Sequence, residues 1–307
     1  MSAGVIGGQR AVIETAGAMR SAGQAFALVL VARTEGSTYR KPGALALVGE
    51  NGVHVGVISG GCLESGVEVL AREALQAGAP RLTVFDTRGD DDLIFGSGSG
   101  CRGRMHLLAL PTTAVACREQ LDAIIAAGRA RRPITLALDT LAPGLLDDGQ
   151  VTVRPGLQIL ALGAGPEARP LLRIAQTLGW YCCVADHREG LVAPERIGRP
   201  DRVLLRRPAE ALQELSGERF DAALVMTHVA DADLEALHAL ARSEIPYVGL
   251  LGPPGRRDEL LARLDASERA ALGPRLHAPV GLPLGGEGPE AIALAIAAQL
   301  QQRVPGA

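Results

Sequence analysis

The pattern of hydrophobic positions changes character once along the chain. In the first third, residues 9–22 place Val12, Ile13 and Met19 on one helical face, and residues 25–33 form an almost continuous apolar run. From residue 157 onward, short apolar runs alternate with helical stretches, the pattern of a parallel sheet with helices on its faces. The sequence therefore predicts an α/β protein: an N-terminal mixed α+β domain followed by a C-terminal Rossmann-like doubly wound parallel sheet.

Each domain receives expected elements from this pattern. In the first domain we expect helices at 9–22 and 63–77 and strands at 25–33, 44–48, 53–58, 81–86 and 104–110. Glu50-Asn51-Gly52 between two of these strands is a hairpin signal. In the second domain we expect strands at 157–162, 181–185, 202–204, 222–227 and 247–250, and a last helix that begins at Gly288-Pro289-Glu290.

The intervening stretch has a weaker pattern. A helix is expected at 118–130, with short strands at 134–139 and 150–154. We interpret it as a connecting region that packs on one of the domains. The expected division is 1–111, 112–155 and 156–307.

Composition narrows the class of protein. The 307 residues carry a net charge of -3 and no long basic run, which argues against a nucleic-acid partner. The apolar run 25–32 is too short to span a bilayer, so we expect no membrane segment. Five cysteines without framework spacing indicate a reducing compartment, and we expect a cytoplasmic protein. Cys117, Cys182 and Cys183 are expected to be inert, partly buried thiols.

Two glycine loops that end in cysteine carry the first candidate chemistry. Ser59-Gly60-Gly61-Cys62 lies where an apolar strand gives way to a helix, and a helix start favours an anion or a thiolate. The second loop contains Gly98, Gly100, Cys101 and Arg102. Together the loops suggest a site for a large anionic ligand with a thiol beside it. The alternative is that either thiol is structural. Glu64 is expected to be a first-turn partner of the helix dipole rather than a ligand or a base.

A nucleotide-binding fingerprint opens the second domain. Gly163-Ala164-Gly165-Pro166-Glu167-Ala168 has the form G-x-G-x-x-A between an expected strand and an expected helix. Gly163 would make the tight turn, and Gly165 would let a pyrophosphate approach the backbone. Asp186, 23 residues after Gly163, is placed to bind ribose hydroxyls. The alternative is a Rossmann frame kept for packing or for another phosphate ligand.

Further candidates lie at the carboxyl ends of later strands. His228 follows the strand at 222–227 and is either an acid/base group or anion contact, or a loop histidine that caps the next helix. Asp231 and Asp233 are expected to be solvated residues at a helix start. The loop 252–257 is either a phosphate contact or an exposed basic turn.

The motifs occur in an order that resembles the xanthine dehydrogenase accessory factor family, XdhC/CoxI. The matching strings are Gly36-Ser37-Thr38-Tyr39-Arg40-Lys41-Pro42-Gly43, Ser59-Gly60-Gly61-Cys62-Leu63-Glu64, the stretch Gly98 to Gly103, Leu162-Gly163-Ala164-Gly165, Asp186-His187-Arg188, Val225-Met226-Thr227-His228, Tyr247-Val248-Gly249-Leu250-Leu251-Gly252 and Pro279-Val280-Gly281-Leu282. Where the family usually has Cys-Gly-Gly, this chain has Cys101-Arg102-Gly103. Arg102 either binds a phosphate there or blocks the usual approach to the backbone.

The resemblance implies a cofactor-handling role. Such factors bind molybdenum cofactor (molybdopterin), protect it during sulfuration and deliver it to a molybdenum hydroxylase apoenzyme, with a cysteine desulfurase as a further partner. The thiols of Cys62 and Cys101 would then do the chemistry together with His228, and Cys62 would contact the metal. A homodimer is a reasonable expectation.

Two other functions remain open from the residues alone. One is an NAD(P)-dependent oxidoreductase that uses the second domain, with NAD(P) or another nucleotide as its ligand. The other is a sulfurtransferase in which Cys62 carries a persulfide. Whether the chain is itself an enzyme is left open, with a non-catalytic insertion factor favoured.

Overall fold

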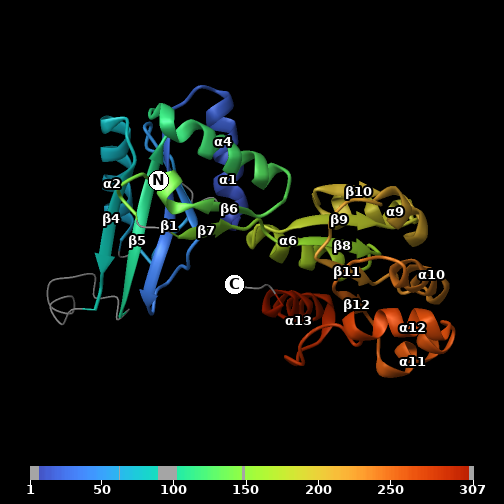
Figure 1. Cartoon of the computed structure of the whole chain (residues 1–307). Helices are drawn as coiled ribbons and strands as arrows, with labels where there is room; N and C mark the ends of the chain where they lie inside the picture. Colours follow the sequence, from blue (N-terminus) through green and yellow to red (C-terminus); the bar gives the residue numbers. More distant parts are fainter. Residues whose placement is uncertain (1–6, 62, 89–101, 147–148, 304–307) are drawn as a thin grey trace. The chain divides into compact units, whose positions relative to one another are not determined.

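The chain folds as two compact units with a boundary between Gly156 and Leu157. The computed structural model describes residues 7–61, 63–88, 102–146 and 149–303 (Figure 1). No helix in these ranges is both long enough and apolar enough to cross a membrane. Each unit has its own sheet and its own cores, so each is described by itself.

The first unit is built on a five-stranded antiparallel sheet. Its order is β3-β2-β1-β5-β4. The strands are β1 (Phe26–Gly36), β2 (Leu45–Gly49), β3 (His54–Val55), β4 (Arg81–Asp86) and β5 (Gly103–Pro111). The hairpin expected around Asn51 is confirmed, because β2 and β3 pair antiparallel across that turn.

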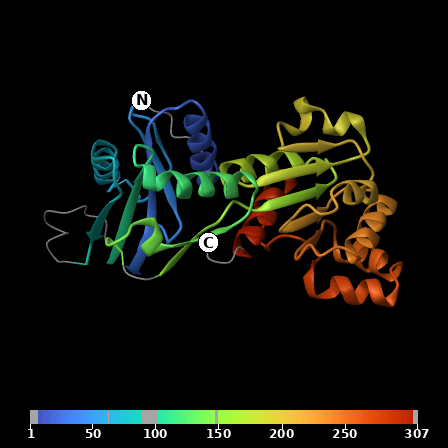
Figure 2. The same cartoon turned by 45° about the horizontal axis from the view of Figure 1, so that its top comes forward.

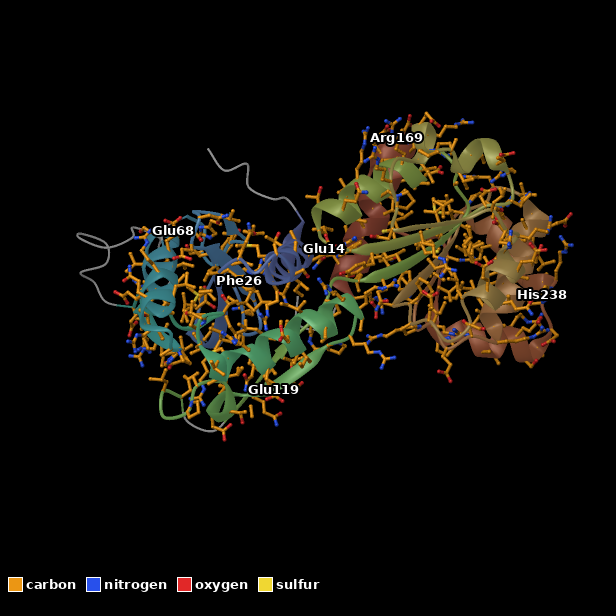
Figure 3. All side chains as sticks on the ribbon, turned by 90° about the horizontal axis from the view of Figure 1, so that it is seen from above. Glu14, Phe26, Glu68, Glu119, Arg169 and His238 are labelled. Atoms are coloured by element: carbon orange, nitrogen blue, oxygen red, sulfur yellow. The ribbon has the colours of Figure 1, made fainter. Side chains whose placement is uncertain are left out.

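Helices cover both faces of this sheet, so residues 26–32 of the central strand β1 are buried on both sides. Helices α1 (Gly8–Ser21) and α4 (Val115–Arg129) pack on one side and α2 (Glu64–Ala77) on the other (Figure 1). Alternate β1 side chains divide between the two cores: Phe26, Leu28 and Leu30 face α1 and α4, whereas Ala27, Val29 and Val31 face α2. Figure 3 labels the buried Phe26 together with Glu119, which lies on the exposed side of α4.

The segment between the two predicted domains belongs to the first unit. After α4 it forms β6 (Ile134–Ala137), the short helix α5 (Leu138–Leu141) and β7 (Gln150–Val153), and β6 and β7 pair as an antiparallel ribbon. Apolar side chains from α4, α5 and β7 enter the same core as β1: Leu121, Ile124, Leu138 and Val151. The stretch 112–155 therefore lies within the first unit and packs into its core.

One expected strand is shorter than its apolar run. The run at 53–58 predicts a long strand, but β3 ends at Val55. Gly56 has φ 91°, and a Cβ there would lie 2.8 Å from the Leu45 carbonyl oxygen and 2.8 Å from Val12 Cγ2. The chain turns at this crowded glycine, and Ile58 is buried in the core beneath α2 instead of continuing the ladder.

The second unit is the predicted doubly wound sheet. All neighbours in its order, β10-β9-β8-β11-β12-β13, run parallel. The strands are β8 (Gln158–Leu162), β9 (Tyr181–Ala185), β10 (Arg202–Leu204), β11 (Ala222–Val225), β12 (Val248–Leu250) and β13 (Leu276–His277). The chain runs outward from β8 to β10 and then returns to β11 on the other side of β8. The carboxyl ends of β8 and β11 therefore form a topological switch point, the usual ligand crevice of such sheets.

Helices lie on both faces of this sheet (Figure 2). One face carries α6 (Ala168–Thr177), α7 (Glu189–Val192), α8 (Pro194–Ile197) and α13 (Gly288–Gln302). The other carries α9 (Pro208–Glu214), α10 (Ala230–Ala241), α11 (Pro254–Ala262) and α12 (Ala266–Leu272), which leads through the short 3-10 helix Gly273–Arg275 into β13.

Candidate functional site

Two of the glycine-rich motifs in the first unit pack against each other at the end of β1. The Ser37 N–H donates to the Arg102 carbonyl oxygen at 3.3 Å. A Cβ on Gly36 would lie 2.5 Å from that same oxygen, and a Cβ on Gly103 would lie 2.3 Å from the Ser37 carbonyl oxygen. The two backbones can approach this closely only because glycine stands at both places.

The Ser59 loop comes near this junction through Tyr39. A Cβ on Gly60 would lie 3.9 Å from the Tyr39 ring, which is in ordinary contact range. Gly60 and Gly61 are exposed, and a Cβ on Gly61 would meet no atom of the described part of the chain within 4 Å. The Gly61 backbone has φ 107°, and no other described residue crowds it, so a ligand can approach it closely from that side.

The Glu64 carboxylate stabilises the Ser59 loop by accepting hydrogen bonds from it. The Ser59 N–H and hydroxyl both donate to Glu64 Oε1, at 2.9 and 3.0 Å, and the Leu63 N–H donates to Ser59 Oγ at 2.9 Å. Ser59 is only 1% exposed. Glu64 thus does more than complement the dipole of α2: it ties the residues on both sides of Gly60 and Gly61 into one closed turn.

His54 extends this arrangement toward β3. Its Nδ1 lies 3.1 Å from Glu68 Oε1, and its Nε2 lies 3.5 Å from Glu64 Oε2. His54 Nε2 and Glu64 Oε2 are both buried and have no hydrogen-bond partner among the residues that the structure describes. The Glu64 carboxylate is therefore held between the serine turn and an imidazole.

Paired charges lie at the end of the sheet where Gly36 of β1 pairs with Gly103 of β5. Asp86 Oδ2 lies 2.8 Å from Arg88 Nη2 and 2.8 Å from Arg104 Nη2. Hydrogen bonds from Arg88 and then Arg104 hold the pKa of Asp86 far below its ordinary range. Since these arginines are already paired with a carboxylate, the exposed Arg102 is the better candidate for contact with an anionic ligand.

Several predicted site residues fall outside the described ranges. These are Cys62, Gly98, Gly100 and Cys101. The other cysteines, Cys117, Cys182 and Cys183, are all buried as expected, and burial raises the pKa of the Cys117 thiol. In the ranges with described positions, no group of three or more His, Cys, Asp or Glu side chains is arranged to hold a metal ion.

In the second unit, the fingerprint glycine Gly163 packs on the end of β11. Its N–H donates to the Ala185 carbonyl oxygen at 2.8 Å, and its φ is 122°. A Cβ at this position would lie 2.4 Å from the Met226 carbonyl oxygen and 2.6 Å from Thr227 N. The tight turn therefore joins the carboxyl ends of neighbouring strands.

Asp186 is fully engaged by the protein. Its Oδ2 accepts from Ala164 N at 2.8 Å and from Arg188 Nη2 at 2.7 Å, and its Oδ1 accepts from Arg188 N and Nε at 2.9 Å each. Burial alone raises the pKa of Asp186, but the hydrogen bonds from Arg188 and Ala164 together hold that pKa below its ordinary value. The side chain has no exposed surface.

A second buried carboxylate orients the loop before His228. The Arg188 guanidinium donates to the Thr227 carbonyl oxygen at 2.9 Å. The Thr227 N–H and hydroxyl donate to Asp233 Oδ1 at 3.1 and 2.6 Å, and Arg256 Nη2 lies 2.6 Å from Asp233 Oδ2. The expectation that Asp233 is solvated is wrong, because it is completely buried as the acceptor for this loop, whereas Asp231 is exposed as expected.

His228 pairs with Glu167, a residue that sequence reasoning did not propose as functional. Its Nε2 lies 2.9 Å from Oε2 of Glu167, in the loop between β8 and α6. The His228 side chain is 47% exposed and the Glu167 side chain 8%. Glu167 occupies one of the x positions of the G-x-G-x-x-A fingerprint, where the motif specifies no residue type. It reaches His228 only because the fold pairs β8 with β11. His228 thus pairs with a buried carboxylate at the switch point, while its own side chain stays partly exposed to solvent.

The fold and the motif loops define a two-unit class: an antiparallel unit with glycine–cysteine loops, followed by a Rossmann unit. The XdhC Rossmann domain matches residues 159–300, and the XdhC and CoxI family matches residues 19–86. The chain belongs to the XdhC and CoxI family.

Individual relatives agree with this assignment. The chain is 28% identical to a Bacillus subtilis protein described as a probable subunit of xanthine dehydrogenase, covering 90% of this chain and 92% of the relative. It is 23% identical to the molybdenum cofactor insertion chaperone PaoD of Escherichia coli, covering 75% of this chain and 68% of that protein. A crystal structure described as a xanthine dehydrogenase from Bacillus halodurans superposes with a TM-score of 0.79 at 29% identity, covering 94% of both chains.

Proposed function

We propose that this chain is an accessory protein that binds molybdenum cofactor and assists its sulfuration and its insertion into a xanthine dehydrogenase-type molybdenum hydroxylase. The observation that carries the proposal is the junction of motif loops in the first unit: Gly36 and Ser37 on Arg102 and Gly103, with Tyr39 beside Gly60. The similarity to PaoD, described as a molybdenum cofactor insertion chaperone, points in the same direction.

The residues of this junction suit an anionic cargo with a reactive sulfur and metal end. Gly60 and Gly61 leave exposed backbone for close approach, and the exposed guanidinium of Arg102 suits a phosphate. In the proposal Cys62, which directly follows Gly61, offers the thiolate nearest the molybdenum end, and Cys101, which precedes Arg102, is the second thiol. Glu64 holds the turn on which Cys62 is carried.

The partners follow from this role. The receiver of the cargo is a molybdenum hydroxylase apoenzyme, and a cysteine desulfurase supplies the sulfur. We propose that the protein acts in the cytoplasm and as a homodimer. In this role the chain is a carrier rather than an independent oxidoreductase.

The test is the cargo itself. The full chain, purified from a host that has a working cofactor pathway and a molybdate supply, is expected to contain molybdenum and to yield oxidised-pterin fluorescence. Cys62→Ala should lose most of both signals, and Arg102→Ala should weaken retention of the pterin. Cys117→Ala removes a buried thiol from the same unit and is the matched control, with its folding checked by circular dichroism.

The contrary outcomes are distinct. A folded protein without molybdenum and without pterin would overturn the carrier role. If it instead held cyanide-labile sulfur that Cys62→Ala removed, a persulfide sulfurtransferase would replace it. Full cargo in both Cys62→Ala and Cys101→Ala would keep the function but refute the assigned thiols.

A further inference from the structure

The space above the second fingerprint glycine is occupied by the protein's own side chains. In a dinucleotide-binding unit this glycine leaves room for the pyrophosphate to approach the backbone. Here a Cβ on Gly165 would lie 2.9 Å from His228 Cδ2, 3.0 Å from His228 Nε2 and 3.1 Å from Glu167 Oε2. The imidazole and the carboxylate therefore stand where the approach would be made.

The imidazole is held over this glycine by its surroundings. His228 has φ 63°, a left-handed conformation that a histidine rarely adopts. Thr227, the residue before it, is fixed on one side by Asp233 and on the other by Arg188. The pairing with Glu167 at 2.9 Å completes the arrangement. Contacts from several elements thus maintain a strained residue in this one place.

Charge and hydrogen bonding oppose a dinucleotide at this loop as well. Glu167 directly precedes α6, so its carboxylate already supplies a negative charge beside the helix start that a phosphate would otherwise use. Asp186, the expected ribose acceptor, has four N–H donors from the protein and no exposed side-chain surface. The protein's own groups thus occupy both parts of the fingerprint: the glycine loop at the start of α6 and the Asp186 carboxylate.

We propose that Glu167 and His228 are specificity-determining residues that close this glycine loop to dinucleotides such as NAD(P). Gly163 and Gly165 then serve close packing: Gly163 against the Met226 backbone, and Gly165 under the His228 ring. The inference is independent of the cofactor-carrier role, because it concerns the second unit alone.

The test removes the two side chains and measures binding to the full chain by isothermal titration calorimetry. Inorganic pyrophosphate probes the place above Gly165 directly, and NADH probes the whole crevice. The double variant Glu167→Ala/His228→Gly deletes both groups, and glycine suits the positive φ at position 228. We expect the unaltered protein to show no saturable NADH binding up to about 1 mM, and the double variant to bind pyrophosphate at least about tenfold more tightly than the unaltered protein.

Two further variants isolate the cause. His238→Ala breaks a similar pair elsewhere in the same unit, where His238 Nδ1 lies 2.8 Å from Glu268 Oε1, and should bind like the unaltered protein. Glu167→Gln removes the charge but keeps the volume, so its gain should be smaller than that of the double variant. Micromolar NADH binding by the unaltered protein would overturn the proposal. So would a double variant that circular dichroism shows to be folded but that gains no affinity for pyrophosphate.

Discussion

At the scale of single residues, Glu64 is the side chain on which the Ser59 turn depends. It accepts from both polar groups of the nearly inaccessible Ser59. Glu64→Ala would leave a buried N–H without an acceptor, so we expect the free energy of unfolding of the first unit to fall by about 1–3 kcal/mol. Urea denaturation measures this. Glu64→Gln retains an acceptor oxygen and should lose less.

A carboxylate on the exposed side of α4 provides the control for this prediction. Glu119→Ala should change the free energy of unfolding by no more than about 0.5 kcal/mol. If Glu64→Ala were as harmless as Glu119→Ala, the Ser59 turn would not depend on its hydrogen bonds.

Asp186 gives the second unit a defined response to acid. Because the folded state lowers its pKa, the unfolded chain takes up the proton first as the pH falls. The stabilisation is complete above about pH 4, the ordinary range of an aspartate, and declines as the pH falls from there through the lower folded-state pKa.

Asp186→Asn tests this directly. We expect it to destabilise the second unit by about 2–4 kcal/mol at pH 7, because it breaks the ion pair between the buried Asp186 and the partly exposed Arg188. Urea unfolding at decreasing pH should show the difference from the unaltered protein shrinking below about pH 4. A difference that stays constant down to about pH 2 would mean that ionised Asp186 contributes no such stabilisation.

At the scale of elements, the contact between α1 and α4 depends on a glycine. A Cβ on Gly128 would lie 2.5 Å from Ile13 Cγ2 and 2.7 Å from its Cδ1. Gly128→Ala should therefore destabilise the first unit by about 1–3 kcal/mol through overpacking, despite the better helix propensity of alanine.

A double-mutant cycle measures whether this cost arises between the two helices. In an Ile13→Ala background the crowding atoms are gone, so Gly128→Ala should cost markedly less there than in the unaltered protein. Equal costs in the two backgrounds would place the effect within α4 itself.

The turn between β8 and α6 makes a similar demand. Gly163 has φ 122° and no room for a Cβ beside the Met226 backbone, so Gly163→Ala should cost about 3 kcal/mol or more in unfolding free energy. Gly255→Ala is the control: this glycine lies in α11 with open space around its Cβ position, and the change should be neutral or slightly stabilising. Thermal and urea unfolding compare them.

Local pattern predicts most elements, and long-range contacts account for the rest. The helix that begins at Gly288 and the strand at 202–204 are predicted correctly because proline position and apolar runs are local signals. The predicted extent of β3 is wrong because Gly56 is crowded by Leu45 and Val12. The Glu167–His228 pair escapes prediction because its partners are 61 residues apart and meet only in the folded sheet.

At the scale of the whole molecule, the unit boundary has a direct consequence for fragments. Residues 7–156 and 157–307 each contain complete cores, so each fragment should fold alone and unfold cooperatively in urea. A fragment ending at residue 111 should fail to fold, because it lacks the α4 side chains that fill the core beside β1. Native-like circular dichroism from that fragment would contradict the boundary.

The sequence does not predict which domain the stretch 112–155 packs against, because an apolar helix face indicates burial but not the surface that buries it. The apolar face of α4, with Leu121 and Ile124, predicts burial but fits either unit equally well. In the structure these α4 side chains share a core with β1, so the stretch belongs to the first unit.

Strand β1 finally sets a limit on how the chain can change in length. Its large side chains, Phe26, Leu28 and Leu30, face one core, and its small ones, Ala27, Val29 and Val31, face the other. Inserting or deleting one residue would exchange the two sets along the rest of the strand. Leucines would then press into the side shaped for alanine and valine, and voids would open opposite. We therefore expect single-residue insertions and deletions between Phe26 and Ala32 to be absent from functional homologues of this protein.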